Sequence, residues 1–396
     1  MVRVGTKWDG FKTSIFSVMT QKAQAAGAVN LAQGFPDFDG PDVIKDAAVA
    51  AIRGGLNQYA PAPGLPELRR LLAEREAKLT SVRYAWETEV TVFSGATEAL
   101  YCAMQAFLEA GDEIIALEPF YDSYPAAAHA AGAKLVAVPL TPPTFALDAA
   151  ALAGAVTPRT RMLIVNTPHN PSGHVLSLGE LTAIRDLAVA NDLLVITDEV
   201  YEELTYAPAR HVSLASLPGM AERTIVVSST SKTFSMTGWK IGYAFAPAPL
   251  TQALRAVHQY TVFCSAAPLQ AGMIQALKLP EAYFEGFRRD YRAKRDILTT
   301  SLQKAGFTCA APEGTYFVLA DYSRIKDVDD VTFATWLTTE IGVAAIPVSA
   351  FYADQVKAAR ELRFVRFAFC KDEATLKAAG NRLATLNPQL PPGPSA

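Results

Sequence analysis

Three short segments of this sequence carry side chains that could do chemistry together. Asn170 lies in Asn-Pro-Ser-Gly, Asp198 and Tyr201 lie in Asp-Glu-Val-Tyr, and Lys232 lies in Ser-Thr-Ser-Lys. An amide, a carboxylate, a phenol and an amine can move protons and form a covalent bond with a carbonyl carbon. Each segment alone also has an ordinary structural explanation, as a turn, a helix cap or a solvated lysine. Their meaning therefore depends on whether the fold brings them together.

Short apolar runs rich in β-branched residues predict the elements that would position these side chains. The runs span 90–93, 113–117, 134–138, 162–166, 193–197, 224–228 and 241–245. Several are continuously apolar, which is typical of strands buried on both faces. Helical patterns lie between them, and one of these is opened by a capping box from Ser177 to Glu180. We therefore predict an α/β fold with a doubly wound, mainly parallel, seven-stranded sheet.

The polar segments follow the predicted strands directly. Asn170, Asp198 and Lys232 each come a few residues after the end of a strand. A Ser-Gly-Ala-Thr segment at 94–97 follows the first strand and opens a helix. In doubly wound sheets, ligands bind in the crevice beyond the carboxyl ends of the strands. We expect these groups to line one crevice.

The two ends of the chain have a different character from its middle. Residues 1–40 predict an irregular arm, and residues 41–285 predict the large domain that holds the sheet. A charged helical stretch at 281–304 is followed by strand-like segments near 314–320, 343–348 and 363–369. These predict a smaller α+β domain over residues 286–396, to which the arm contributes.

Composition and charge exclude several classes of protein. Lys and Arg total 36 against 39 Asp and Glu, a net charge of −3, which does not favour nucleic acid or an acidic membrane surface. There is no G-x-G-x-x-G fingerprint for nicotinamide or flavin, no metal-binding motif and no C-x-x-C pair. The four cysteines are interpreted as buried, inert thiols. We expect a soluble, cytoplasmic protein without a metal site.

The polar segments belong to a longer series of motifs that runs through nearly the whole chain. The series comprises Leu31–Phe38, Asn57–Pro61, Asn170–Gly173, Asp198–Tyr201, Ser229–Lys232 with Gly238–Gly242, and Arg363–Phe369. In content and order it resembles the class I pyridoxal-phosphate aminotransferases, and among these the branch of the kynurenine and bacterial methionine enzymes. The resemblance implies a fold type I transferase that binds pyridoxal 5′-phosphate in its large domain. It also implies a homodimer with shared active sites.

The resemblance implies roles for the residues around the cofactor ring. Lys232 would carry the cofactor as a Schiff base and then move a proton at the substrate, with Asp198 and Tyr201 as the other catalytic residues. Asp198 would face the pyridine nitrogen and keep it protonated, so that the ring withdraws electrons. Tyr201 and Asn170 would bind the phenolic oxygen, and Asn170 would also contact the substrate. Phe120 would stack on the ring.

The resemblance also implies a phosphate site at the start of a helix. The backbone amides of Ala96 and Thr97 would bind the phosphate, because the amino end of a helix favours an anion. The hydroxyl of Ser229, the ammonium of Lys240 and Tyr59 from the second subunit would complete the site. Lys240 stands where most of the wider class has arginine, which keeps the charge but loses the bidentate geometry.

For the substrate, the resemblance points to the two ends of the chain. Arg366 would bind the α-carboxylate through its guanidinium fork, with Gly34 beside it. The alternative for Arg366 is a surface ion pair. Phe16 and Phe263, the latter from the partner subunit, would line an apolar pocket, for which the alternative is ordinary core packing. Cys264 stands where the kynurenine enzymes have histidine, which favours methionine, glutamine or aromatic amino acids as donors.

These roles predict an aminotransferase that moves an amino group from an amino acid to a 2-oxo acid by a ping-pong mechanism. A cysteine-S-conjugate β-lyase would use the same lysine, aspartate and arginine, because cofactor and substrate carbanion are common to both reactions. Kynurenine aminotransferase activity is a further alternative. A non-catalytic sensor domain that binds the same cofactor is a more distant one.

Overall fold

The computed structural model describes residues 5–11 and 13–386. The chain divides into two compact units. The large unit comprises Phe35–Ala293 and Pro312–Tyr316, and the small unit comprises Met1–Gly34, Lys294–Ala311 and Phe317–Ala396. Helix α12 (Glu281–Lys304) contributes to both units. The large unit therefore includes Pro312–Tyr316, a segment that the sequence placed in the smaller domain.

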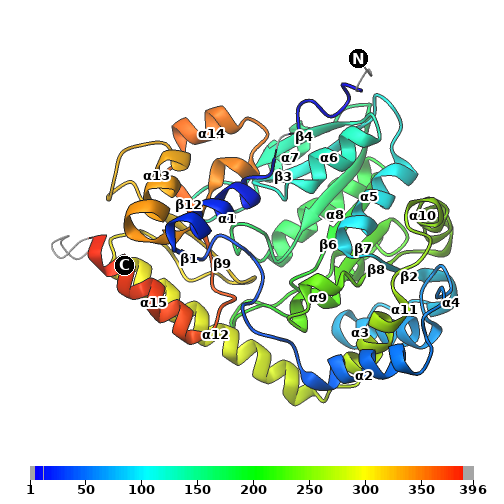
Figure 1. The fold of residues 1–396 in the computed structure, drawn as a ribbon. Coiled ribbons are helices and arrows are strands. Elements are labelled where there is room, and N and C mark those ends of the chain that lie inside the picture. The colour runs from blue at the N-terminus through cyan, green and yellow to red at the C-terminus, as the bar shows by residue number, and fades with distance from the viewer. Residues whose placement is uncertain (1–4, 12, 387–396) are drawn as a thin grey trace. The chain divides into compact units, whose positions relative to one another are not determined.

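The large unit contains a seven-stranded sheet, as predicted. The strands are β2 (Val90–Phe93), β3 (Glu113–Glu118), β4 (Lys134–Pro139), β5 (Thr160–Asn166), β6 (Leu194–Asp198), β7 (Thr224–Ser229) and β8 (Gly242–Phe245), in the order β2-β8-β7-β6-β5-β3-β4 (Figure 1). Strand β8 runs antiparallel to β2 and β7, and the other neighbours are parallel. The doubly wound, mainly parallel fold is thus confirmed.

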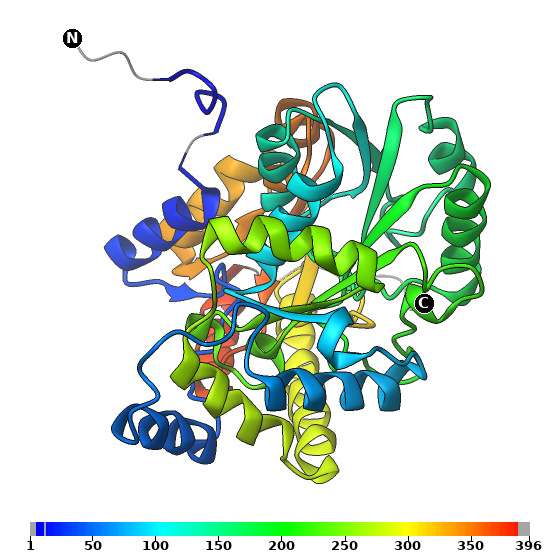
Figure 2. The same ribbon diagram turned by 90° about the vertical axis from the view of Figure 1, so that its right-hand side faces the viewer.

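Helices cover both faces of this sheet (Figures 1 and 2). One core cluster joins the strands to α5 (Ala96–Phe107), α6 (Ser123–Ala130) and α10 (Ala248–Thr261), and the other joins them to α3 (Pro66–Thr80) and α11 (Ala267–Leu277). Ile225 and Val227 of β7 belong to the first cluster and Val226 to the second, because successive side chains of a strand point to opposite faces. Each such buried side chain stabilises the fold by roughly 1.5–3 kcal/mol.

The remaining helices of the large unit connect these layers. They are α2 (Asp42–Arg53), α4 (Trp86–Glu89), α7 (Ala149–Gly154), α8 (Leu178–Ala190) and α9 (Thr230–Thr233), with 3-10 turns at Leu214–Ser216 and Thr237–Trp239. Helix α2 lies beside α11 in both views (Figures 1 and 2). The predicted capping box is present: the Ser177 hydroxyl accepts from the amide of Glu180, whose side chain accepts from the amide of Ser177.

The small unit is an α+β structure. Its elements are α1 (Ile15–Ala26), β1 (Val29–Asn30), β9 (Phe317–Asp321), α13 (Asp330–Trp336), a π turn (Leu337–Ile341), β10 (Val343–Ala344), β11 (Ile346–Pro347), a 3-10 turn (Val348–Phe351), α14 (Gln355–Glu361), β12 (Phe364–Ala368), α15 (Glu373–Leu383) and a 3-10 turn (Ala384–Leu386). Strands β11, β12 and β9 form an antiparallel sheet, and β1 pairs with β10 in parallel.

The prediction of an irregular arm is wrong for residues 15–26, which form α1. The hydroxyl of Ser14 caps this helix by accepting from the amide of Ser17, and Gly27 ends it in the left-handed conformation. Met19 and Ala23, four residues apart, are its buried side chains. So short an apolar stripe is a weak signal of a helix in the sequence. Packing against the rest of the small unit stabilises α1.

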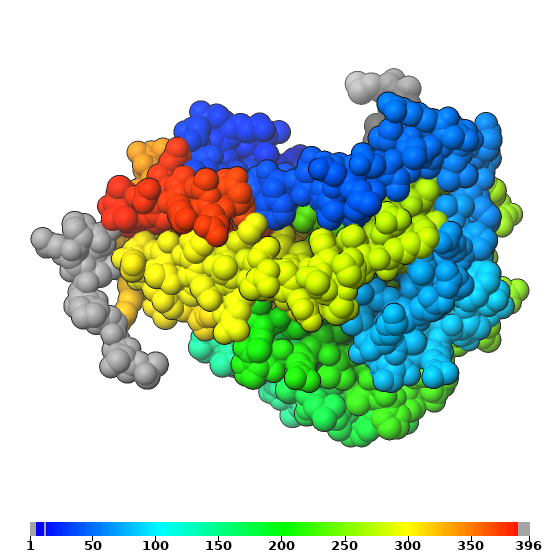
Figure 3. Space-filling view, turned by 90° about the horizontal axis from the view of Figure 1, so that it is seen from below, coloured from blue at the N-terminus to red at the C-terminus, as the bar shows by residue number. Residues whose placement is uncertain are grey.

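Helix α12 lies on the surface seen in Figure 3, with α15 against its C-terminal half. A Cβ on Gly380 of α15 would lie 2.7 Å from Oγ of Ser301, so glycine permits this close approach.

Of the helices in the described part of the chain, none has the length and apolar character to cross a membrane. Cys102 and Cys370 are buried, but the prediction of buried thiols is wrong for Cys264 and Cys309, which lie in loops and are partly exposed.

Candidate active site

Polar residues that the sequence predicted to act together lie along one edge of the large-unit sheet. Asp198 is the last residue of β6 and pairs in register with Asn166, the last residue of β5. Ser229, the last residue of β7, pairs with Gly242 at the start of β8. Because β8 is antiparallel, its amino end meets the carboxyl ends of the other strands. This is the edge at which ligands bind in doubly wound sheets.

Asp198 is a buried carboxylate, with 5% of its surface exposed. Its Oδ2 accepts a hydrogen bond from the hydroxyl of Tyr124 at 2.7 Å, and its Oδ1 accepts one from the amide of Val200 at 3.4 Å. Burial raises the pKa of Asp198 to about 6, while these two hydrogen bonds and the charge of Lys232 act in the opposite direction. The ionised form of Asp198 at neutral pH therefore depends on these partners.

Asn166 fixes the loop that carries Asn170 to the end of β6. Its Nδ2 donates to the backbone oxygen of Asp198 at 2.8 Å, and its Oδ1 accepts from the amide of Asn170 at 2.7 Å. All three residues are buried. Because both halves of one amide are used, the two loops cannot shift independently without breaking a buried hydrogen bond.

Lys232 lies on α9, which starts directly after β7. Its side chain is half-buried, and Nζ lies 5.8 Å from the ring centre of Tyr201 and 5.7 Å from that of Tyr316. The two rings meet edge to face at 5.2 Å. An ammonium within about 6 Å of aromatic faces is attracted to them. The charge of Lys232 also lowers the pKa of Asp198, as an amine close to that carboxylate should.

The amino end of α5 forms a cradle with a lysine over it. Gly95 precedes the helix with φ of 90°, and no side chain of the described residues caps α5. A Cβ on Gly95 would lie 2.9 Å from Nζ of Lys240, and one on Gly242 would collide with the amide nitrogen of Ala96. Ala96 is half-buried and Thr97 exposed. Uncapped helix amides beside an ammonium make a site for an anion.

The other predicted residues of the large unit occupy two different environments. Phe120 follows β3 and is buried in the same core cluster as Tyr124. Tyr59 and Phe263 are on the surface, 83% and 41% exposed, and their rings meet edge to face at 5.2 Å. Such exposed aromatic side chains are available to a second molecule.

In the small unit, Arg366 lies on β12 and is 2% exposed. Its guanidinium carbon is 3.9 Å from the ring centre of Phe317, 4.9 Å from that of Phe351 and 5.2 Å from that of Phe16, and its Nη2 donates to the backbone oxygen of Ala32 at 3.1 Å. The surface ion pair considered for Arg366 is therefore wrong, because the side chain is buried among rings.

The nearby Arg363, unlike Arg366, does form a surface ion pair, with Asp327 at 3.2 Å. Phe16 lies on α1, half-buried, with its ring 5.8 Å from that of Phe351. Gly34 is half-buried in the loop after β1. The small unit thus places an aromatic side chain of α1 close to the guanidinium of β12.

Comparison with known proteins decides the family. Residues 26–383 match the sequence profile of the family described as aminotransferase class I and II. The chain belongs to this family. It is 48% identical, over 95% of its length and 96% of the relative's, to a probable N-succinyldiaminopimelate aminotransferase of Mycobacterium tuberculosis. It is 41% identical to the methionine aminotransferase of Escherichia coli, over 94% and 96% of the two chains. It is 37% identical to human kynurenine–oxoglutarate transaminase 3, over 94% and 87%.

Solved structures agree with the sequence match. The Mycobacterium tuberculosis enzyme superposes with a TM-score of 0.93 at 47% identity, covering 97% of this chain and all of the other. The Escherichia coli methionine aminotransferase gives the same TM-score at 40% identity, with 97% and 100% coverage. The predicted activity class, an aminotransferase, is therefore confirmed.

In this aminotransferase, some residues of the candidate site are absent from the sequence-based prediction. Tyr124 contacts Asp198, Tyr316 flanks Lys232, and Asn166 joins two loops. Asn166 ends a predicted strand, and this position is a signal that could have found it. Tyr124 and Tyr316 lie far from their partners in sequence, so only the fold reveals the contacts.

A buried group of acidic residues lies behind the turn that carries Asp198. Oε2 of Glu199 lies 2.7 Å from Nε2 of His211, and Oε1 of Glu202 accepts from the hydroxyl of Tyr243 at 3.0 Å. Burial raises the pKa of Glu202 to about 7; burial, with the charges of Glu199 and Glu202, raises that of Glu76 to about 8. Burial alone would lower the pKa of His211, but the charge of Glu199 raises it above its ordinary value. The contacts of Glu199 with His211 and of Glu202 with Tyr243 connect the turn after β6 to these two side chains.

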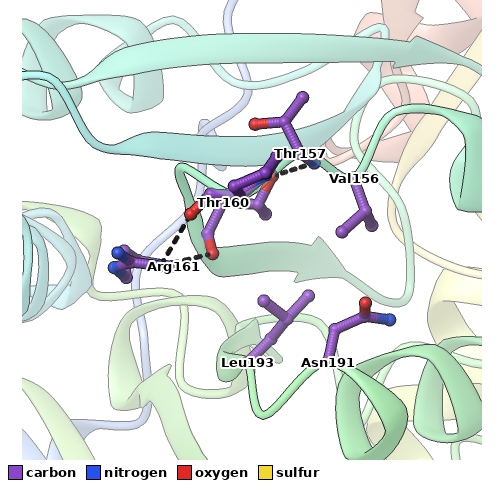
Figure 4. A pocket seen from close by; sticks show the side chains of 7 residues that line it. Val156, Thr157, Thr160, Arg161, Asn191 and Leu193 are labelled. Carbon is purple, nitrogen blue, oxygen red and sulfur yellow. Dashed lines mark hydrogen bonds between the residues drawn. The ribbon is translucent and has the colours of Figure 1, made fainter.

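A cavity of about 370 Å³ lies at the opposite, amino ends of β5 and β6 (Figure 4). Its lining comprises Val156, Thr157, Pro158, Thr160, Arg161, Asn191 and Leu193. Nη1 of Arg161 donates to the backbone oxygens of Pro158 at 3.1 Å and Thr160 at 3.4 Å. The cavity is thus separate from the candidate site, which lies beyond the carboxyl ends of the same strands. Within residues 5–11 and 13–386, no group of His, Cys, Asp and Glu is arranged to hold a metal ion.

Proposed function

We propose that this aminotransferase binds pyridoxal 5′-phosphate at the carboxyl edge of its large-unit sheet and transfers an amino group from an amino acid to a 2-oxo acid by a ping-pong mechanism. The supporting observation is the buried carboxylate of Asp198 near the amine of Lys232, at the edge that also carries the cradle of Gly95 and Lys240. These groups fit the three parts of this cofactor: a ring nitrogen, an aldehyde and a phosphate. When bound, the cofactor supplies an electron sink for negative charge at the substrate Cα.

The cradle is proposed to hold the phosphate. The amides of Ala96 and Thr97 would donate to its oxygens, with the hydroxyl of Ser229 and the ammonium of Lys240 beside them. An exposed lysine at an uncapped helix end supports this assignment, because both the ammonium and the helix dipole stabilise an anion.

The ring is proposed to lie against Asp198. A carboxylate there would accept from the ring nitrogen and keep it protonated. Tyr201 and Asn170, on loops that β6 and Asn166 hold in place, would bind the phenolic oxygen, and Phe120 would stack on the ring. The burial of all four side chains supports a site that excludes water.

Lys232 is proposed to hold the cofactor covalently through Nζ and then to move a proton at the substrate Cα. Its half-buried position between two tyrosine rings supports this role, because the rings limit the positions that Nζ can take. A lysine acts as a base when its amine is neutral, after the covalent bond to the cofactor has been released.

The substrate α-carboxylate is proposed to bind Arg366, near Gly34, with Phe16 and the partner's Phe263 around the side chain. A guanidinium held between rings is preorganised to bind a carboxylate bidentately. Methionine, glutamine and aromatic amino acids are the proposed donors. Relatives named for N-succinyldiaminopimelate and kynurenine add those compounds as candidates, and β-elimination of cysteine S-conjugates is the alternative reaction.

We further propose a cytoplasmic homodimer, in which Tyr59 reaches the phosphate site of the other subunit. The exposure of Tyr59 and Phe263 supports a second subunit. The four free thiols are typical of a reducing compartment.

The decisive variant is Lys232→Ala. The wild-type protein, reconstituted with pyridoxal 5′-phosphate, should gain visible absorption and turn over. Lys232→Ala should lose both while keeping its circular dichroism, because only the covalent attachment and the base are removed. Lys278→Ala, which removes a surface lysine paired with Glu67, is the matched control and should behave as wild type. Wild-type absorption and turnover in Lys232→Ala would exclude the proposed role.

A donor screen defines the reaction. Each candidate amino acid is incubated with a 2-oxo acid, and formation of the new amino acid is measured. Stoichiometric amino acid formation indicates transfer. Pyruvate and ammonia from a cysteine S-conjugate indicate elimination.

A further inference from the structure

The partner of Asp198 on the neighbouring helix is Tyr124. The Tyr124 hydroxyl, on α6, lies 2.7 Å from Oδ2 of Asp198, and the two residues are 2% and 5% exposed. Its ring is packed in the core cluster that includes Phe120 and Ala127. The hydroxyl is therefore held at a defined place and does not depend on a mobile loop.

The phenol is the donor in this hydrogen bond. Burial, together with the negative charge of Asp198, raises the pKa of Tyr124 well above its ordinary value, so the phenol keeps its proton. A neutral O–H facing a carboxylate donates to it, and such charge-assisted bonds are about twice as strong as neutral ones.

The two oxygens of Asp198 are used unequally. Oδ2 accepts the short bond from Tyr124, whereas from residues 5–11 and 13–386 Oδ1 accepts only the long bond of 3.4 Å, donated by the amide of Val200. A carboxylate oxygen has two lone pairs, so Oδ1 retains the capacity to accept a strong hydrogen bond from a ligand.

We infer that Tyr124 is a positioning residue for the transamination: its hydroxyl holds Oδ2 of Asp198, leaves Oδ1 to accept from the protonated ring nitrogen of the cofactor, and keeps the carboxyl ionised. This inference rests on the proposed function and deepens it.

The charge balance at Asp198 explains why the hydroxyl matters. Burial favours the neutral carboxyl, and Glu199 on the same turn adds to this effect. Tyr124 from α6, the amide of Val200 and Lys232 from α9 oppose it. The pKa of Asp198 is about 6 with this hydrogen bond in place. Loss of the bond should raise that pKa by about one to two units, which would leave the carboxyl largely protonated at neutral pH. A neutral carboxyl cannot hold a proton on the ring nitrogen.

The test compares Tyr124→Phe with Tyr322→Phe. Tyr322 is also fully buried, and its hydroxyl donates to the backbone oxygen of Val328 at 2.9 Å in the small unit, so its loss removes a phenol without touching Asp198. The first measurement is the thermal midpoint of the cofactor-free protein as a function of pH. It depends on no bound group.

The expected sign follows from proton binding. The pKa of Asp198 is about 6 in the folded protein against an ordinary value of 3.8, so the folded state binds more protons between these values and stability falls as pH rises. In Tyr124→Phe the thermal midpoint should continue to fall to a pH about one to two units higher than in wild type, to about pH 8. In Tyr322→Phe the thermal midpoint should depend on pH as it does in wild type. In an Asp198→Asn background, Tyr124→Phe should produce no such extension.

The second measurement uses the reconstituted enzyme. Tyr124→Phe should lower kcat roughly tenfold at neutral pH with a small change in KM, and the acid limb of its pH profile should move up by about one to two units. The visible absorption should still form, because Lys232 is intact.

The outcomes separate the two proposals. A pH dependence of stability in Tyr124→Phe that matches that of Tyr322→Phe would overturn the inference, even in an active enzyme. If the reconstituted wild type showed no visible absorption, the proposed function would fail, and with it the cofactor part of this inference. The bond between Tyr124 and Asp198 would still be judged by the stability profile.

Discussion

At the scale of single residues, two arginines three positions apart, one just before β12 and one within it, have opposite environments. Arg363 lies at the surface and pairs with Asp327, whereas Arg366 is buried among Phe16, Phe317 and Phe351. Arg366 is a buried residue of β12, whereas Arg363 precedes the strand and reaches water. A surface ion pair contributes little, but a guanidinium held between rings is preorganised to bind a carboxylate.

Arg366→Lys should lower kcat/KM for amino acids roughly ten- to hundredfold, mainly through KM. Lysine keeps the charge but loses the bidentate fork, which is worth one charge-assisted hydrogen bond or more. The affinity for pyridoxal 5′-phosphate should change little. Steady-state kinetics and a cofactor titration measure the two effects.

Arg363→Ala is the matched control and should leave both quantities within about twofold, because surface ion pairs are weak. Equal effects of the two substitutions on KM would remove Arg366 from the substrate site.

At the scale of elements, the turn between β2 and α5 brings a helix end and a lysine together. Gly95 adopts a φ of 90°, and Lys240, which itself lies in the left-handed region, passes over it. A side chain at Gly95 would occupy the place of the lysine amine. The cradle therefore depends on the absence of a Cβ.

Gly95→Ala should weaken binding of pyridoxal 5′-phosphate by about tenfold or more, because it displaces the Lys240 ammonium from the helix end. It should also lower stability by about 1–2 kcal/mol, since alanine is strained at a positive φ. Gly111→Ala separates the two effects, because Gly111 has a φ of 95° and its Cβ would meet no described atom within 4 Å.

We expect Gly111→Ala to lose similar stability and to bind the cofactor as wild type does. Thermal unfolding and equilibrium titration measure both variants. Unchanged cofactor affinity in Gly95→Ala would show that the phosphate binds elsewhere.

At the scale of the whole molecule, the exposed aromatic side chains point to a second subunit. Tyr59 is 83% exposed, Tyr260 86% and Phe263 41%. Tyr59 and Phe263 also contact each other edge to face. Grouped aromatic side chains on a surface are typical of an interface between proteins. The proposed homodimer would cover them and carry Tyr59 into the neighbouring site.

Mixed dimers test this sharing. Tyr59→Ala and Lys232→Ala should each have low activity as pure dimers. In a hybrid, one site would carry both substitutions and the other neither, so random mixing of equal amounts should restore about a quarter of wild-type activity. Activity is measured after subunit exchange, with the unmixed variants as the baseline. No recovery in confirmed hybrids would show that Tyr59 acts within its own subunit or not at all.

Much of the fold was predictable from local pattern. Strands β2 to β8 were found within two residues of their bounds, because continuously apolar, β-branched runs have few other stable arrangements in water. The capping box of α8 was found because its chemistry is contained in four consecutive residues. The short helix α1 is not predictable in this way, because its buried residues Met19 and Ala23 give too weak an apolar stripe without the packing of the small unit.

The sequence also specified which polar groups stand at the ends of which strands, since strand direction alone places Asp198 and Ser229 at one edge. It could not specify contacts between distant segments. The bond from Tyr124 to Asp198 joins residues 74 positions apart. The placement of Lys240 over Gly95 and the burial of Arg366 among rings likewise depend on how separate elements pack. The local sequence determines the helices and strands, through short-range steric effects and the spacing of apolar residues. The environment of each side chain is determined by residues distant in sequence, which only folding brings near.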